Sequence, residues 1–306
     1  MKKLFTLFFS LILSVSVFAQ KAGLSLNLQK DQVYKQVTTS KGTIVQDFNG
    51  QKLNMVMIMA GTMSYRVKSV SPAGYNMEVS FDNLSMAMQV PQGNVEFNSE
   101  KNDPNDIFST VLNAMKNKPF RVVMSKSGKV TEIDGVDAMW GSTIDQFSQL
   151  SDAQKAQIKA QIMKSYGEEA MKGSIETATA IYPEKPVNKG DKWTVSTKLE
   201  AGMSANLNTE FQYAENTADH ALLRGTSTIA TADKDAYIET NGIPMKYDIT
   251  GSQVSEIKVD KKTGWILEAK INQNMKGDAH IKDNPQLPGG MTIPMTIESE
   301  TTISGK

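Results

Sequence analysis

The stretch TIVQDFNGQKLNMVMIM, residues 43–59, shows how this chain folds. Two segments rich in β-branched and apolar residues flank Asn49-Gly50. Both turn residues accept the positive φ of a type I′ turn, whose twist matches that of two antiparallel strands. The stretch therefore predicts a β-hairpin that turns at Asn49-Gly50.

Hairpin patterns of the same kind recur along the chain. MSYRVKSV and YNMEVSF flank a turn at residues 71–74, and RVVMSK and KVTEI flank Ser127-Gly128. After residue 190, strand-like segments follow one another again, from KWTVSTKL to MTIPMTIESETTI. Most of the chain is therefore expected to form antiparallel β-sheet.

A first helix is expected to interrupt the strands near 104–117. Asp103-Pro104 fits an N-cap followed by a proline in the first turn. Apolar residues then recur at helical spacing: Ile107, Val111, Leu112 and Met115.

A second, longer helical region is expected at about 136–181. Ser151 and Gln154 have the spacing of a capping box, and Gly167 is a natural break within the region. Pro183 and Pro186 end the helical pattern and begin a linker.

The β-rich parts before and after these helices resemble diverged copies of each other. The matching segments follow one another in the same order in both copies. The spacing between them differs, because the first copy carries the additional helix. Chance similarity between turns of antiparallel proteins is the alternative explanation. Three pairs of segments correspond: LQKDQVY (28–34) with VNKGDKW (187–193), YRVKSVSPAGYNMEV (65–79) with FQYAENTADHALLRG (211–225), and KSGKV (126–130) with KTGWI (262–266).

The expected fold class is therefore α+β, with two curved antiparallel β-sheets that arose by duplication and pack with the helices. The expected domain organisation assigns residues 20–135 to a first β-rich lobe with one helix. Residues 136–185 form the helical segment and linker, and residues 186–306 form the second β-rich lobe. Whether the two lobes share one sheet is open at this point.

Residues 1–19 have the pattern of a signal peptide. Lys2 and Lys3 precede an almost wholly apolar run that ends at Val17-Phe18-Ala19, which suits cleavage after Ala19. The run is shorter than the ~20 apolar residues that span a bilayer. The expected protein is exported, periplasmic or extracellular, and has no transmembrane segment after cleavage.

Composition narrows the possible functions further. The chain has no cysteine, which excludes disulfides, thiol nucleophiles and cysteine metal sites. Without Lys2 and Lys3, 31 basic residues remain against 33 acidic residues, and both signs are spread along the chain. This distribution argues against a nucleic-acid partner, which needs a basic patch.

Signals for an enzyme are few. The two histidines, His220 and His280, lie far apart in sequence, and no hydrolase or phosphate-loop motif is present. Glu132 and Asp134 would share a strand face, so a carboxylate-dependent hydrolase is the alternative to a non-catalytic protein. Solvated acids beside a turn explain the same residues more simply.

The methionine-rich strand within residues 52–65 carries the most information about function. Because alternate side chains share one face of a strand, Met55, Met57 and Met59 form one row, and Val56 and Ile58 belong to the other. Both rows are mostly apolar, so we expect this strand to be covered on both sides.

A later segment, NLSMAMQV, places Met86 and Met88 on one face. If the two strands share a sheet, five thioethers line one surface.

Three roles are open for that surface. It could simply pack in the core, it could bind an apolar ligand through flexible and polarizable side chains, or its soft sulfur atoms could bind Cu(I). No cofactor or metal is included in the expected function.

Several phrases resemble a known family. The leader, the openings KDQVY and KGDKW, and SKSGKVTEIDGVDAM (125–139) are similar to a family of exported, two-lobed β-rich proteins known only as a domain of unknown function. The architecture more loosely resembles lipoprotein carriers of the LolA/LolB type. That resemblance implies an antiparallel sheet curled around helices with a fatty ligand inside. It supplies no catalytic residue.

The expected function is a non-catalytic exported protein that binds or carries an apolar or lipid-like ligand. Its candidate ligand-binding residues are Met55, Met57, Met59, Met86 and Met88. The alternative is a structural or interaction protein of the cell envelope, without a small ligand, that offers a strand edge to a protein partner.

Overall fold

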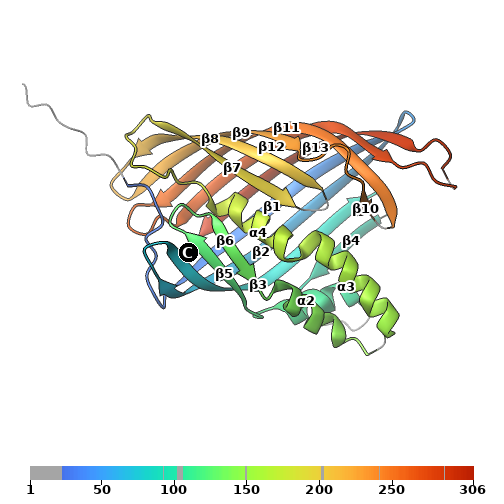
Figure 1. Cartoon of the computed structure of the whole chain (residues 1–306), viewed down its shortest axis with the longest axis horizontal. Helices are drawn as coiled ribbons and strands as arrows, with labels where there is room; N and C mark the ends of the chain where they lie inside the picture. The colour runs from blue at the N-terminus through green and yellow to red at the C-terminus, as the bar shows by residue number, and fades with distance from the viewer. Residues whose placement is uncertain are drawn as a thin grey trace, which may run out of the picture.

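A computed structural model describes residues 23–91, 93–101, 106–148, 150–200, 203–240, 242–285 and 287–306. The expected signal peptide, residues 1–19, lies outside the described residues. A large curled β-sheet forms most of the molecule, and helices lie along one side of it (Figure 1). The α+β class expected from the sequence is confirmed.

The thirteen strands belong to one sheet rather than two. Strands β1 and β13 pair antiparallel, from Gln36 opposite Gly305 to Gln46 opposite Met295, and this pairing joins the two β-rich parts edge to edge. The order is β6-β5-β3-β2-β1-β13-β12-β11-β9-β8-β7, with β4 paired to β3 and β10 paired to β11.

The first part contains six strands, which are β1 (Val33–Phe48), β2 (Gln51–Val70), β3 (Gly74–Val90), β4 (Gly93–Asn98), β5 (Phe120–Ser125) and β6 (Val130–Asp134). The second part contains seven strands, which are β7 (Lys192–Glu200), β8 (Ser204–Asn216), β9 (His220–Thr231), β10 (Ile238–Thr240), β11 (Ile243–Asp260), β12 (Ile266–Ile281) and β13 (Met291–Gly305).

The hairpin between β1 and β2 turns where the sequence predicts. Phe48 pairs with Gln51, and the two residues between them, Asn49 and Gly50, have φ of 54° and 90°. These positive values are the ones that a type I′ turn requires. The N–H of Gly50 also donates to Asp47 Oδ1 at 2.6 Å.

The strand registers support the duplication. Tyr65 lies opposite Val79 in β2–β3, and in the second copy Phe211 lies opposite Gly225 in β8–β9. These are the residues that the segment match aligns. Just beyond Tyr65, and at the same place beyond Phe211, the register shifts by one residue at a β-bulge. A shared bulge at an equivalent position is difficult to explain by common turn sequences alone.

Helix α1 (Ile107–Met115) lies within the first part, between β4 and β5. Three helices connect the two parts: α2 (Val136–Asp145), α3 (Asp152–Tyr166) and α4 (Glu168–Thr179). The expected capping box is present, because Ser151 accepts from Gln154 N–H and the Gln154 side chain accepts in return from Ser151 N–H. Gly167 separates α3 from α4 as expected.

The helix near 104–117 is confirmed, although its N-cap is Asp106. The expected cap Asp103 and Pro104 lie outside the described residues.

Helix α4 lies between β6 and β7, the two ends of the strand order (Figure 1). The Glu176 carboxylate accepts from Val130 N–H at 2.9 Å, and Thr179 Oγ1 donates to Gly128 O at 2.7 Å. On the other side, Gly173 packs so closely on β7 that an added Cβ would lie 2.5 Å from Lys198 O. Helix α4 therefore closes the gap that the curled sheet leaves open.

The main core fills the end of the sheet where β2 turns into β3 and β11 turns into β12. Trp265 packs between Tyr34 and Tyr65, with ring centroids 5.3 and 5.2 Å away, and its Nε1 donates to Lys35 O. The segment before β1 covers this end with the buried side chains of Leu26 and Leu28. Within the described residues, no helix combines the length and the apolar character needed to cross a bilayer.

Candidate ligand-binding face

The sheet has an inner face, which carries the buried side chains of Tyr65 and Val67 and packs on the helices, and an outer face. Residues directly opposite each other on neighbouring strands share a face. Met57 lies opposite Met88, and Met59 lies opposite Met86. The alternation along β2 places these side chains on the inner face together with Met55. We call the surface of Met55, Met57, Met59, Met86 and Met88 the Met face.

The geometry thus brings the five predicted methionines together on one surface, but it does not bury them. Met59 is 40% exposed, and the other four are half-buried. On the outer flank of β2, Val56 and Ile58 are also half-buried. The prediction that this strand is covered on both sides is wrong. Two apolar rows indicate two covering layers only where the protein packs on both flanks, whereas here the side chains on both flanks stay partly exposed.

The second copy shows what a covered version of the same surface looks like. There the pair equivalent to Met59 and Met86 is Ala205 and Thr231, and Ala205 is only 1% exposed. Its neighbour Leu207 is 2% exposed and lines an enclosed space of about 20 Å³ together with Thr177 of α4. Helix α4 therefore lies over Leu207 in the second copy, whereas Met59 in the first copy is exposed.

Further apolar side chains extend the Met face at the edge of the sheet. Strand β4 places Val95 opposite Met88 and Phe97 opposite Met86. Val95 is 42% exposed, and Phe97 contacts Phe108 of α1 with ring centroids 4.7 Å apart. Phe108 is 65% exposed. Sequence reasoning missed these three residues, although the alternation in NVEFN was a signal.

The second copy also contributes methionines to the inner face beside the Met face. Met275 lies opposite Ile297, Ile297 lies opposite Ile44, and Ile44 lies opposite Met55, so one continuous apolar row crosses four strands. Met295 packs in the same cluster as Met275, and three half-buried methionines adjoin them: Met203, Met245 and Met291. Spacing along the sequence could not reveal that these residues meet the Met face, because the pairing of β1 with β13 brings them there.

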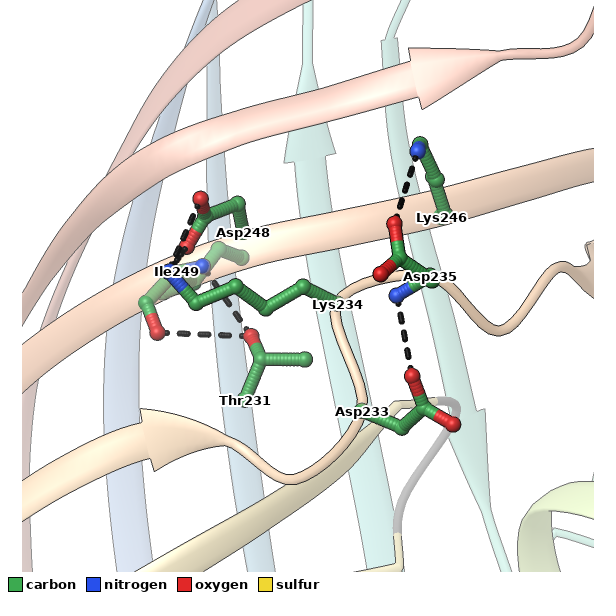
Figure 2. Close-up of polar contacts among 7 residues, drawn as sticks. All are labelled: Thr231, Asp233, Lys234, Asp235, Lys246, Asp248 and Ile249. Carbon is green, nitrogen blue, oxygen red and sulfur yellow. Dashed lines mark hydrogen bonds and ion pairs between the residues drawn. The ribbon is translucent and has the colours of Figure 1, made fainter.

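A separate groove of about 540 Å³ lies mainly over outer-facing residues, and its charges are mixed. Asp248 lies opposite Asp278 on the next strand, and Lys52 and Lys276 also line the groove. Figure 2 shows that Lys234 Nζ reaches Asp248, at 2.8 Å from Oδ1, while Lys246 pairs with Asp235 at 3.3 Å. Lysines balance the acids here, and these pairs fit an exposed charged surface.

One of the two carboxylates considered for catalysis, Glu132, is held in an ion pair. Both guanidinium nitrogens of Arg121 donate to Glu132, at 2.6 and 3.0 Å, and these hydrogen bonds lower the pKa of Glu132. Asp134 lies opposite Arg121 on the neighbouring strand. An ionised carboxylate already engaged by arginine is poorly suited to take up a proton near neutral pH. Among the described residues, no group of three or more aspartate, glutamate or histidine side chains gathers as around a metal ion.

Comparisons with known proteins add a family match. A model described as a family of unknown function (DUF6263) matches residues 72–266. No curated protein matches the sequence.

Among solved structures, the chain is similar to one titled "Lipid-protein interactions in lipovitellin", at 8% identity and a TM-score of 0.49, over 92% of this chain and 25% of that one. It is also similar to the COG4313 outer membrane channel from Pseudomonas putida F1, at 6% identity and a TM-score of 0.26, over 93% and 98% of the two chains. The chain thus spans a quarter of the lipovitellin chain.

Proposed function

Since this chain belongs to the DUF6263 family, whose function is unknown, we propose its function from the geometry of the Met face. The protein binds and carries an apolar, lipid-like ligand on that face, without catalysing a reaction. The observation that carries the proposal is that Met59 is 40% exposed, while Ala205, its equivalent in the second copy, is 1% exposed. A ligand on the Met face gives the first copy the cover that its equivalent already has within the protein.

The chemistry of the surface supports this function. A contiguous exposed apolar surface on a globular protein commonly marks a binding site. Methionine is unbranched and polarizable, so a methionine surface can adapt to flexible hydrocarbon. Complete burial of a fully exposed methionine side chain is worth about 1.5–3 kcal/mol. Covering the partly exposed methionines of the Met face supplies a fraction of this value at each position.

The proposed place of action is outside the cytoplasm, after removal of residues 1–19. The support for this part is the sequence alone: a basic start, an apolar run and Ala19 before the cleavage point. A lipid-like ligand needs a carrier in an aqueous compartment, because its apolar surface is otherwise exposed to water.

A protein partner is the second candidate for the same surface. The observation in its favour is Phe108, an aromatic side chain that is 65% exposed beside the Met face. Aromatic residues are frequent anchors of protein interfaces. The strand edges of β6 and β7 are less suited to such a partner, because α4 lies between them.

Titration of a fluorescent fatty probe into the purified protein tests the proposed function. Met59→Asp introduces a charge into the Met face and is expected to weaken probe binding by at least ten-fold, since burying an unpaired carboxylate under hydrocarbon is costly. The matched control is Thr39→Asp, because Thr39 is exposed on the outer face of the neighbouring strand. Absence of probe binding to the wild-type protein, or equal loss in both variants, contradicts the proposal. If a cross-linker attached at position 108 captures another protein, and no lipid is bound to the Met face, the second candidate is favoured.

A further inference from the structure

A band of uncharged polar side chains adjoins the Met face on the inner face of the sheet. Ser40 Oγ and Thr301 Oγ1 form a hydrogen bond of 2.8 Å, and Ser299 Oγ donates to Gln273 Oε1 at 3.3 Å. All four side chains are half-buried. We call Ser40, Thr301, Ser299 and Gln273 the polar band.

The polar band lies in the same cross-strand rows as the Met face. Met59 is opposite Ser40, and Ser40 is in turn opposite Thr301. Neighbouring strands lie about 4.8 Å apart, so the backbone of Thr301 is roughly 10 Å from that of Met59. One amphiphilic molecule can therefore contact both surfaces at once.

The inner face around both surfaces carries no charge. Among the described residues of β1, β2, β3, β12 and β13, every position that shares the inner face with Met59 is uncharged. Charged residues of the same strands point outward, for example Lys41, Glu298 and Glu300, which are exposed. On these strands a ligand therefore meets thioethers, hydroxyls and amides, and no charged side chain among the described residues.

The inner face also has hydrogen-bonding capacity that the protein does not use. A serine or threonine hydroxyl can donate once and accept twice, so the single bond between Ser40 and Thr301 leaves acceptor sites free. Such groups gain free energy when a ligand supplies a partner.

From these observations we propose that the ligand is an uncharged amphiphile, whose hydrocarbon lies on the Met face and whose hydroxyl, ester or amide group hydrogen-bonds to the polar band. The inference rests on the proposed function and narrows its ligand class. An ionised carboxylate or phosphate in the same place loses hydration without gaining a positive partner. A neutral head group exchanges hydrogen bonds with water for equivalent bonds with the band.

Competition against the fluorescent fatty probe with two ligands of equal chain length tests this inference. 1-Monomyristoylglycerol is uncharged, and myristate is ionised at pH 8 because carboxyl groups titrate near pH 4. The expected result is on the order of ten-fold tighter binding of the glycerol ester, the effect of one or two hydrogen bonds. The double variant Ser40→Ala/Thr301→Val removes both hydroxyls and is expected to abolish that preference.

The control variant is Thr302→Val, because Thr302 is exposed on the outer face of the same strand; it should keep the wild-type preference. Thermal unfolding of each variant separates loss of fold from loss of contact. Equal affinity for the ester and myristate, or a preference that survives in the double variant, overturns the inference and leaves the proposed function standing. Failure of the probe and of both ligands to bind overturns the proposed function as well.

Discussion

Met59 lies directly opposite Met86 on the inner face of the β2–β3 pair, and neither side chain is buried. A single protein sheet thus contains one buried copy of this surface, at Ala205, and one partly exposed copy, at Met59. In the second copy, Thr177 of α4 lines the same small space as Leu207, the neighbour of Ala205. The open copy is the basis of the proposed binding function.

The two kinds of methionine on β2–β3 should differ sharply in their contribution to stability. Met77 is 0% exposed in the main core, so Met77→Ala removes packed volume and is expected to lower the free energy of unfolding by about 2–5 kcal/mol. Met59→Ala changes a side chain that touches solvent, so its effect should be within about 0.5 kcal/mol. Urea unfolding measures both values. A similar loss for the two variants would show that Met59 is a core residue.

Oxidation should distinguish the same residues chemically. Solvent-accessible methionines are converted to the sulfoxide more readily than buried ones. Peptide mapping after brief peroxide treatment should find Met59 oxidised before Met77 and Met124, which are both fully buried. Saturation with the fatty probe should slow oxidation of Met59 if that side chain lies beneath the ligand. Equal rates at all three positions would contradict the exposure described above.

The contact between α4 and β7 should be sensitive to a single methyl group. Gly173→Ala places a Cβ 2.5 Å from Lys198 O, so the helix must shift, and the free energy of unfolding should fall by about 1–3 kcal/mol. Gly141 in α2 is the matched control, since nothing lies within 4 Å of an added Cβ there. Gly141→Ala should instead stabilise the protein by about 0.5–1 kcal/mol through its higher helix propensity. If chemical denaturation shows a gain for both variants, the close packing at Gly173 is not present.

Alkaline pH should destabilise the protein through Tyr65. Complete burial raises the pKa of the Tyr65 hydroxyl far above its usual value near 10. Above pH 10 the unfolded chain therefore releases a proton that the folded chain retains, and stability falls as the pH rises. Tyr65→Phe should reduce the loss between pH 9 and 11, measured by urea unfolding at each pH. Tyr237→Phe, at an exposed position, serves as the control for loss of a tyrosine hydroxyl outside the core.

The local features of the fold could be predicted because short-range chemistry determines them. Asn49-Gly50 specifies a tight turn through its backbone freedom, and Ser151 with Gln154 specifies a helix start through two hydrogen bonds. The match between segments 65–79 and 211–225 could likewise be read from residue types, and the shared registers of Tyr65 and Phe211 agree with it.

The exposure of the Met face could not be predicted, because it depends on contacts between distant parts of the chain. Met57 and Val56 lie on opposite flanks of one strand, and their apolar character is compatible with burial or with ligand binding. The packing around each copy decides between these outcomes, and a single glycine, Gly173, sets how closely α4 packs on β7. The pairing of β1 with β13, which brings Met275 and Ile297 into the row of Met55, is a contact of the same kind.

Native mass spectrometry of the protein purified from the cells that produce it tests the central claim most directly. The account predicts a population heavier than the polypeptide by the mass of an apolar molecule, which extraction with organic solvent identifies as an uncharged lipid. That population should be absent from Met59→Asp and retained in Thr39→Asp. A wild-type protein with only the polypeptide mass, which also fails to take up added lipid, would contradict the claim that the Met face is a ligand site.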